Sequence, residues 1–147
     1  MTDLYVTDTV GLINYFHETF SRSSSISAST RRIYDKAFST SEGSVRLSIP
    51  SVVFVEIHEK WCRTEEFSRK FYYNVFKRVC DSPNIEVKPI DREVLENLLR
   101  IRGSLEDHDL HDKLILASAM MLDCPLITCD SEIIKFNDEF NVVDIIF

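Results

Sequence analysis

The sequence predicts an α/β fold, a three-layer α/β/α sandwich built around a central, mainly parallel sheet. Short apolar segments typical of strands alternate with longer segments typical of amphipathic helices along the chain. This alternation favours a parallel sheet that is covered by helices on both faces. The 147 residues include only three Gly and four Pro and contain no internal repeat, so we expect one domain over residues 1–147.

The first half of the chain predicts two strands, each followed by a helix. Runs of Val, Leu and Ile indicate the strands, and apolar residues spaced three or four apart indicate the helices. Consecutive serines indicate a loop, and a proline is typical of the first turn of a helix. The predicted elements are a strand at 4–7, a helix from about residue 10, a loop at 21–30, a short helix at 31–38, a strand at 46–49 and a helix opened by Pro50 and Ser51.

The second half continues this alternation. Aromatic residues at close to i, i+4 spacing predict a helix over 67–79 that packs on the core or on a partner. Alternating apolar and polar residues predict a strand at 85–90, and Asp91 and Glu93 favour a helix start directly after it. The remaining predicted elements are a helix at 109–123, a strand at 125–129 and a final strand at 142–146.

The composition is that of a globular protein. Hydrophobic residues make up 44% and charged residues 28%, and no run approaches the ~20 apolar residues that a membrane span needs. The first residues lack a basic region followed by an apolar stretch, so we expect no secretory signal and a cytoplasmic protein. The four cysteines are scattered and form no CxxC pair, which argues against a zinc site and against disulfides.

The net charge of −7 is unfavourable for a nucleic-acid-binding protein, because contacts to phosphate come mainly from Lys and Arg. The charge is unevenly divided, however. Residues 1–80 carry 11 basic and 9 acidic side chains, whereas residues 81–147 carry 6 basic and 15 acidic ones. Divalent cations bound among the acids would offset part of this negative field.

Two acids, Asp112 and Asp130, bracket a predicted helix and the strand after it. The helix would be roughly 20 Å long and the strand roughly 17 Å, so their lengths nearly match. A chain reversal at the turn-prone residues 123–125 would bring both acids to one edge of the domain. Like charges held that close usually need a cation or a proton between them, although capping and turn formation would also explain each acid alone.

Two further acids follow the first two predicted strands. Asp8 comes directly after the first strand, and Glu56 lies two turns into the helix after the second. Open parallel sheets bind ligands outside the carboxyl ends of their strands, so we expect Asp8, Glu56, Asp112 and Asp130 to converge there. Glu56 has an alternative role outside the site, because it could form an ordinary i, i+4 surface ion pair with Lys60.

The four acids and their surroundings resemble the PIN domain family, and within it the VapC-type ribonuclease toxins of prokaryotic toxin–antitoxin pairs. The resemblance spans nearly the whole chain, and the last two of the segments that carry it are the most specific. These segments are VTDTVGLI at 6–13, SVVFVEI at 51–57, HDKLILASA at 111–119 and LITCD at 126–130.

The resemblance implies that the four acids hold Mg²⁺ or Mn²⁺ in a pocket at the sheet edge, with Thr9 and Thr128 supporting the site. The residue types agree, since both ions prefer oxygen ligands and keep several waters. Such an ion can polarise a phosphodiester oxygen and activate a water for in-line attack, so no side-chain nucleophile is required. The expected metal ligands are Asp8, Asp112 and Asp130, with Glu56 as a further ligand or as a base that orients the water.

The implied function is a metal-dependent endoribonuclease that acts as the toxin of a type II toxin–antitoxin pair, with a cognate antitoxin that covers the acidic site. An exposed aromatic helix at 67–79 would suit a homodimer. The Ser-rich loop is longer than the family pattern leads us to expect. Basic residues in and after this loop could contact RNA phosphates or form an ordinary solvated face. These residues are Arg22, Arg31, Arg32 and Lys36.

The main alternative function is a catalytically inactive PIN-like binding or scaffold protein. Another alternative comes from His111 and Asp112, which are similar to the dyad of HD-type phosphohydrolases, but those enzymes are all-helical and the predicted strands argue against them.

Several other polar residues near the second pair of acids have simpler interpretations. For His108 and His111 we favour a role at the helix start over metal ligation. We expect Asp109 to cap the helix rather than to join the cluster. Glu106 and Asp107 are expected to lie in a solvated loop.

Overall fold

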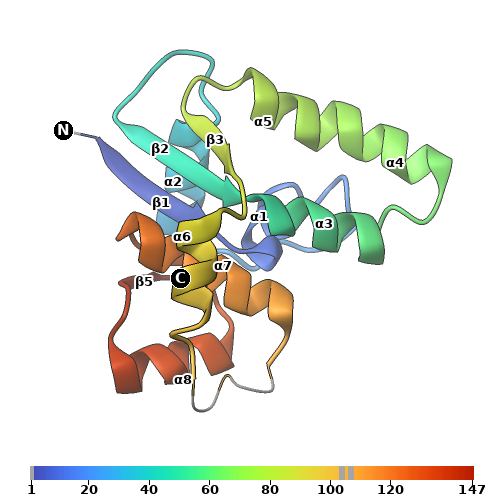
Figure 1. Cartoon of the computed structure of the whole chain (residues 1–147). Coiled ribbons are helices and arrows are strands. Elements are labelled where there is room, and N and C mark those ends of the chain that lie inside the picture. The colour runs from blue at the N-terminus through green and yellow to red at the C-terminus, as the bar shows by residue number, and fades with distance from the viewer. Residues whose placement is uncertain (1, 103–104, 106–107) are drawn as a thin grey trace.

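The computed structural model describes residues 2–102, 105 and 108–147, and its centre is a five-stranded sheet. The strands are ordered β3-β2-β1-β4-β5, and every neighbouring pair is parallel. Helices lie on both sides of this sheet, with α2 behind it and α6 in front in Figure 1. The predicted three-layer sandwich is therefore confirmed. The strands are β1 (Asp3–Thr7), β2 (Val45–Pro50), β3 (Ile85–Lys88), β4 (Leu126–Ile127) and β5 (Ile145–Ile146).

The helices follow the predicted order, and each strand-to-strand connection carries at least one. The predicted helix over 67–79 is a continuous arm of two α-helices joined by a π-helical turn, η1, and it projects beside the sheet in Figure 1. The helical elements are α1 (Thr9–Tyr15), α2 (Ala28–Ala37), α3 (Ser51–Lys60), α4 (Glu65–Phe71), η1 (Tyr72–Phe76), α5 (Lys77–Asp81), α6 (Arg92–Leu98), α7 (Leu110–Leu122) and α8 (Ser131–Phe140).

Three local predictions are corrected by the structure. The segment after Asp130 forms α8, which the sequence analysis did not assign, because Asp130 caps this helix instead of only starting a turn. The helix predicted at 31–38 begins earlier, at Ala28, because the Ser27 side chain caps it by accepting from the Thr30 backbone N–H. The final strands are also shorter than predicted, and Glu106 and Asp107 lie outside the described residues.

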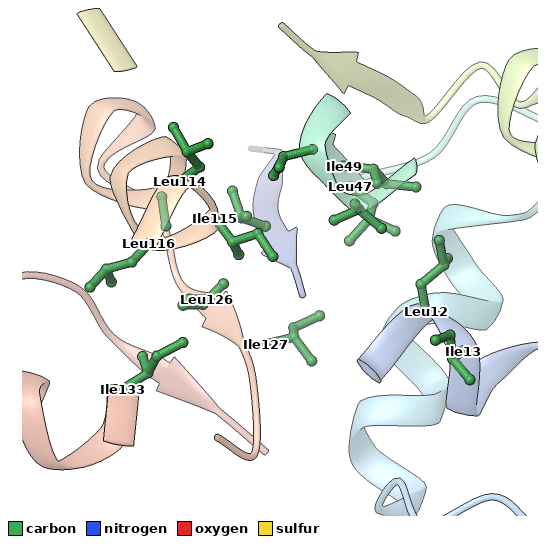
Figure 2. Close-up of a cluster of buried hydrophobic side chains, with 14 of the residues drawn as sticks. Leu12, Ile13, Leu47, Ile49, Leu114, Ile115, Leu116, Leu126, Ile127 and Ile133 are labelled. Carbon is green, nitrogen blue, oxygen red and sulfur yellow. The ribbon is translucent and has the colours of Figure 1, made fainter. Parts of the chain in front are cut away.

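The core fixes the elements that carry the predicted acids. Figure 2 shows Ile115 and Leu116 of α7 in one buried cluster with Leu126 of β4, and all three side chains are fully buried. Burial of one such side chain stabilises the fold by about 1.5–3 kcal/mol. Helix α7 packs on β1 and β2 and also against α3. The start of α7 is thereby held close to α3.

None of the helices in the described part of the chain is both long and apolar enough to span a membrane.

Candidate metal centre

The carboxyl ends of β1 and β4 mark the point where the strand order changes direction. From β1 the chain continues to β2 and β3 on one side, whereas β4 and β5 lie on the other. Asp8 directly follows β1, and Asp130 comes shortly after β4. Ligands of open parallel sheets bind at such switch points. The topology therefore places two of the predicted acids where a ligand site is expected.

A pocket of about 580 Å³ opens at this switch point. All four predicted carboxylates line it: Asp8, Glu56, Asp112 and Asp130. They come from four separate parts of the chain and share no local motif, so the fold alone brings them together. The other residues that line the pocket are Thr9, Val10, Ile13, Arg22, Lys60, Trp61 and Cys129.

Asp8 is buried at the start of α1, with only 5% of its surface exposed. Its Oδ1 accepts a hydrogen bond of 2.7 Å from the Gly11 backbone N–H and thus caps the helix. Burial raises the pKa of Asp8 to about 6, and the charges of Asp112 and Asp130 act in the same direction. Hydrogen bonds from Thr128 and Gly11 offset part of this increase. The Asp8 carboxylate is therefore unfavourable in the absence of a cation.

Gly11 allows Asp8 and its neighbours to pack this closely. A Cβ at this position would collide with the Tyr34 hydroxyl and would lie 3.0 Å from both Asp8 Oδ1 and Thr7 Oγ1. Tyr34 is fully buried and its hydroxyl is hydrogen-bonded to the Thr7 hydroxyl, so it has no free space to move into. Even the smallest side chain must therefore displace the residues that position Asp8.

We expect Gly11→Ala to lower the free energy of unfolding by about 2 kcal/mol, the usual cost of overpacking a tight site. Urea-induced unfolding measures this change. Gly43→Ala is the matched control, because a Cβ at Gly43 would meet nothing within 4 Å. Equal stability of the two variants would contradict the prediction.

Asp112 lies in the first turn of α7, after the capping residue Asp109, which accepts a hydrogen bond from the His111 backbone N–H at 2.7 Å. Asp109 thus has the predicted capping role. Burial, together with the charges of Asp130 and Glu56, raises the pKa of Asp112 to about 6, against the opposing effect of His108.

Asp130 uses its two carboxylate oxygens differently. Oδ1 caps α8 by accepting from the backbone N–H groups of Glu132 and Ile133, at 2.9 and 3.1 Å. Its Oδ2 instead faces Nε2 of His108 at 3.4 Å. The Thr128 hydroxyl accepts from the Asp130 backbone N–H at 3.1 Å and so orients this residue. Capping and ligand binding are therefore compatible, because each uses a separate oxygen.

Glu56 is buried on α3, and its carboxylate is also divided between two roles. Oε2 accepts a hydrogen bond of 2.6 Å from Lys60, which is the i, i+4 pair considered as the alternative. Oε1 is buried and accepts no hydrogen bond from any residue that the structure describes. An unpaired buried acceptor destabilises a protein by about 1–3 kcal/mol. The Lys60 pair therefore leaves one carboxylate oxygen available for a cation.

His108 also belongs to this cluster. Its Nε2 lies 3.1 Å from Asp112 Oδ2 and 3.4 Å from Asp130 Oδ2. His111 lies at the helix start, as the favoured interpretation has it, with its Nδ1 2.8 Å from Asp109 Oδ1. His108 directly precedes the cap, and its contacts with Asp112 and Asp130 add a second interpretation, metal ligation. His108 precedes the capping residue of α7, so no helical spacing could have predicted its direction.

The basic residues predicted to contact substrate lie in different places. Arg22 lines the pocket with its guanidinium 5.6 Å from the centre of the Trp61 ring, in cation–π range. Arg31 donates to the Ser24 hydroxyl and lines a separate cavity with Asp35. Lys36 lines a third cavity, and Arg32 is exposed on α2. Lys60 and Trp61, which sequence analysis did not assign to substrate, lie in the pocket because they follow Glu56 on α3.

The donor atoms in the pocket fit a divalent cation. The ligand atoms form two groups, each within 4.8 Å: His108 with Asp112 and Asp130, and Glu56 with Asp109 and His111. Asp8 belongs to neither group, although it lines the same pocket and interacts electrostatically with Asp112 and Asp130. Carboxylate oxygens are the ligands that Mg²⁺ and Mn²⁺ prefer, and one of those in the pocket has no hydrogen-bond partner among the described residues.

Comparisons with known proteins agree with this fold. A family model described as PIN domain matches residues 5–139. The chain is similar to one in the crystal structure of VapBC2 from Rickettsia felis bound to a promoter DNA fragment, with a TM-score of 0.67, 13% identity and 97% of both chains covered. It is also similar to FitAcB from Neisseria gonorrhoeae, with a TM-score of 0.64, 14% identity and coverage of 97% of this chain and 96% of that one.

A toxin–antitoxin complex from Klebsiella pneumoniae gives a TM-score of 0.54 at 17% identity, again over 97% of this chain and 96% of that one. At these identities the structural similarities establish the fold alone. No curated protein matches the chain in sequence.

Proposed function

The chain belongs to the PIN domain family, and we propose that it is a metal-dependent endoribonuclease that cleaves RNA phosphodiester bonds. The observation that carries this proposal is the pocket at the switch point of the sheet, lined by four carboxylates of which one keeps an unpaired buried oxygen. A binding or scaffold protein has no need for such a cluster, which raises the pKa of Asp8 and Asp112 and so destabilises the metal-free fold.

Asp8, Asp112 and Asp130, which line the same pocket, would hold the ion in this proposal. The free Oε1 of Glu56 binds the ion or orients the attacking water. A bound Mg²⁺ or Mn²⁺ supplies Lewis acidity toward a phosphodiester oxygen and lowers the pKa of a nearby water. The Thr128 hydroxyl keeps Asp130 in place by accepting a hydrogen bond from the Asp130 backbone N–H. Thr9 adds a buried hydroxyl that has no partner among the described residues.

Arg22 and Lys60, which line the same pocket as the carboxylates, bind RNA phosphates in this proposal, and the Trp61 ring supports Arg22. Positive charge at the rim of a negative pocket steers the polyanion to the metal and offsets part of the net charge of −7. Arg31, Arg32 and Lys36 remain predicted phosphate contacts outside this pocket.

We expect Arg22→Gln to raise KM for RNA about tenfold with little change in kcat, because one charge-assisted contact is lost. The dependence of binding on salt concentration should weaken at the same time. Steady-state cleavage at several salt concentrations measures both effects. Arg92→Gln, at an exposed position on α6 that is not a predicted RNA contact, is the control. An equal effect of both variants would mean that Arg22 contributes only to the overall charge.

We further propose that the chain is the toxin of a type II toxin–antitoxin pair, and that a cognate antitoxin covers the pocket. The support is its structural similarity to a chain of a toxin–antitoxin complex from Klebsiella pneumoniae. Two exposed tyrosines on η1, Tyr72 and Tyr73, support a homodimer through the α4–α5 arm.

The test of the enzymatic proposal is incubation of purified protein with mixed RNAs, with Mn²⁺ or Mg²⁺ and with a chelator. We expect cleavage that depends on the added ion. Unchanged RNA under all conditions would contradict the enzyme and favour the binding protein. Growth arrest on induced expression in a bacterial host would support the toxin, and normal growth despite active enzyme would point to another use of the nuclease.

A further inference from the structure

His108 places a nitrogen donor beside Asp112 and Asp130, two of the carboxylates that line the pocket. We propose that its Nε2 is a ligand of the bound ion and that it shifts the selectivity of the site from Mg²⁺ toward first-row transition-metal ions. The inference rests on the proposed function, because it concerns the same ion. It adds a residue that lies outside the four carboxylates and that gives the site a testable metal preference.

The distances agree with ligands that share one ion. Nε2 of His108 lies 3.1 Å from Asp112 Oδ2 and 3.4 Å from Asp130 Oδ2. Two ligand atoms that are each ~2.1 Å from an ion lie about 3.0 Å apart in octahedral and about 3.4 Å apart in tetrahedral geometry. Nε2 therefore lies at the separation of a neighbouring ligand from each of the two oxygens, and ligand atoms of all three residues lie within 4.8 Å of one another.

The contacts of His108 are not those of an ordinary hydrogen-bonded pair. Nε2 is buried and makes no hydrogen bond within the described part of the chain, although both carboxylate oxygens are in ion-pair range. The ring N–H direction therefore points at neither oxygen. His111 differs from His108 in this respect, because its Nδ1 is hydrogen-bonded to Asp109 Oδ1 at 2.8 Å. Of the two histidines, His108 is the one with a buried nitrogen that makes no hydrogen bond to a described residue.

The backbone holds His108 in this position. Its backbone N–H donates to the Leu105 carbonyl oxygen at 3.0 Å, and the Leu105 side chain is fully buried in the core. The next residue, Asp109, caps α7. His108 is thus fixed on both sides, and only 22% of its side chain is exposed.

Ligand chemistry gives the direction of the selectivity. Mg²⁺ favours oxygen ligands and retains its waters, so a nearby imidazole contributes little to its binding. Transition-metal ions gain more from nitrogen, in the order Mn²⁺ < Fe²⁺ < Co²⁺. The contribution of His108 should therefore be largest for Co²⁺, intermediate for Mn²⁺ and smallest for Mg²⁺.

Calorimetric titration of the wild type and His108→Gln with Mg²⁺, Mn²⁺ and Co²⁺ tests this order. We expect the variant to lose about tenfold or more in Co²⁺ affinity, less for Mn²⁺, and to change about threefold at most for Mg²⁺. His58→Gln, on the exposed side of α3, is the control and should change none of the three. An equal loss for all three ions would indicate a structural role, and a gain for all three would indicate a competing cation; either result overturns the proposal.

Pulsed electron paramagnetic resonance of bound Mn²⁺ gives a second readout that does not depend on catalysis. We expect ¹⁴N coupling in the wild type and its loss in His108→Gln. Coupling that is absent from the wild type, or that persists in the variant, contradicts ligation by His108. Ion binding that requires Asp112 but not His108 would remove this inference and leave the nuclease intact, whereas nitrogen coupling without RNA cleavage would remove only the nuclease.

Discussion

Replacing Asp112 with Asn is expected to reduce metal-dependent RNA cleavage by about a thousandfold or more, which corresponds to about 4 kcal/mol of transition-state stabilisation. The charges of Asp130 and Glu56 both act on Asp112, so its carboxylate interacts with acids from two other parts of the chain. Asn keeps the shape of the side chain but removes the charge that attracts the ion. The fold should not suffer, because the charge is unfavourable in the metal-free protein.

The measurement is kcat/KM with Mn²⁺, together with thermal unfolding of each variant. Asp138→Asn is the matched control, since Asp138 is exposed on α8 and its loss changes the net charge by the same amount. A variant that keeps more than about a tenth of the activity would show that Asp112 is not a metal ligand. A variant that unfolds at lower temperature would mean that Asp112 stabilises the fold, contrary to its raised pKa.

The sequence could predict the convergence of the acids because each has a fixed offset from an element. Asp8 directly follows β1, Asp112 lies in the first turn of α7, and both positions follow from local patterns. Their meeting then depends only on strand order, which parallel topology restricts strongly. For this reason the sequence alone predicts that these acids meet at one edge of the sheet.

The residues that escaped prediction depend on tertiary placement or on a missed cap. His108 lies ahead of the helix, and the anchor of its backbone at Leu105 has no sequence signature. Helix α8 does have one, since Asp130 is followed by apolar residues at Ile133 and Phe136. The sequence predicts Asp130 as a site residue or as a turn residue. The structure adds a third role, because Asp130 also caps α8.

We expect the metal-free protein to be more stable near pH 5 than near pH 7.5. Burial raises the pKa of Asp8 from 3.8 to about 6, so between these values the folded state binds more protons than the unfolded state. The stability therefore falls as the pH rises through this window. The whole shift of Asp8 is worth about 3 kcal/mol, of which about 1.4 kcal/mol is lost between pH 5 and pH 7.5, and Asp112 acts in the same direction. The lowered pKa of Asp109 changes the stability only below this window.

Mn²⁺ should reverse this dependence, because it binds the ionised carboxylates of the folded state and adds about 2.7 kcal/mol at a hundredfold excess over its Kd. Urea-induced unfolding at pH 5 and 7.5, with chelator and with Mn²⁺, separates the two effects. Asp8→Asn should be more stable than the wild type at pH 7.5 in chelator and should lose much of the pH dependence. Wild-type stability that rises from pH 5 to 7.5 in chelator would mean that burying these carboxylates in their ionised form does not destabilise the fold. In that case the pocket has no need of an ion, and the central argument for the nuclease would fail together with the prediction.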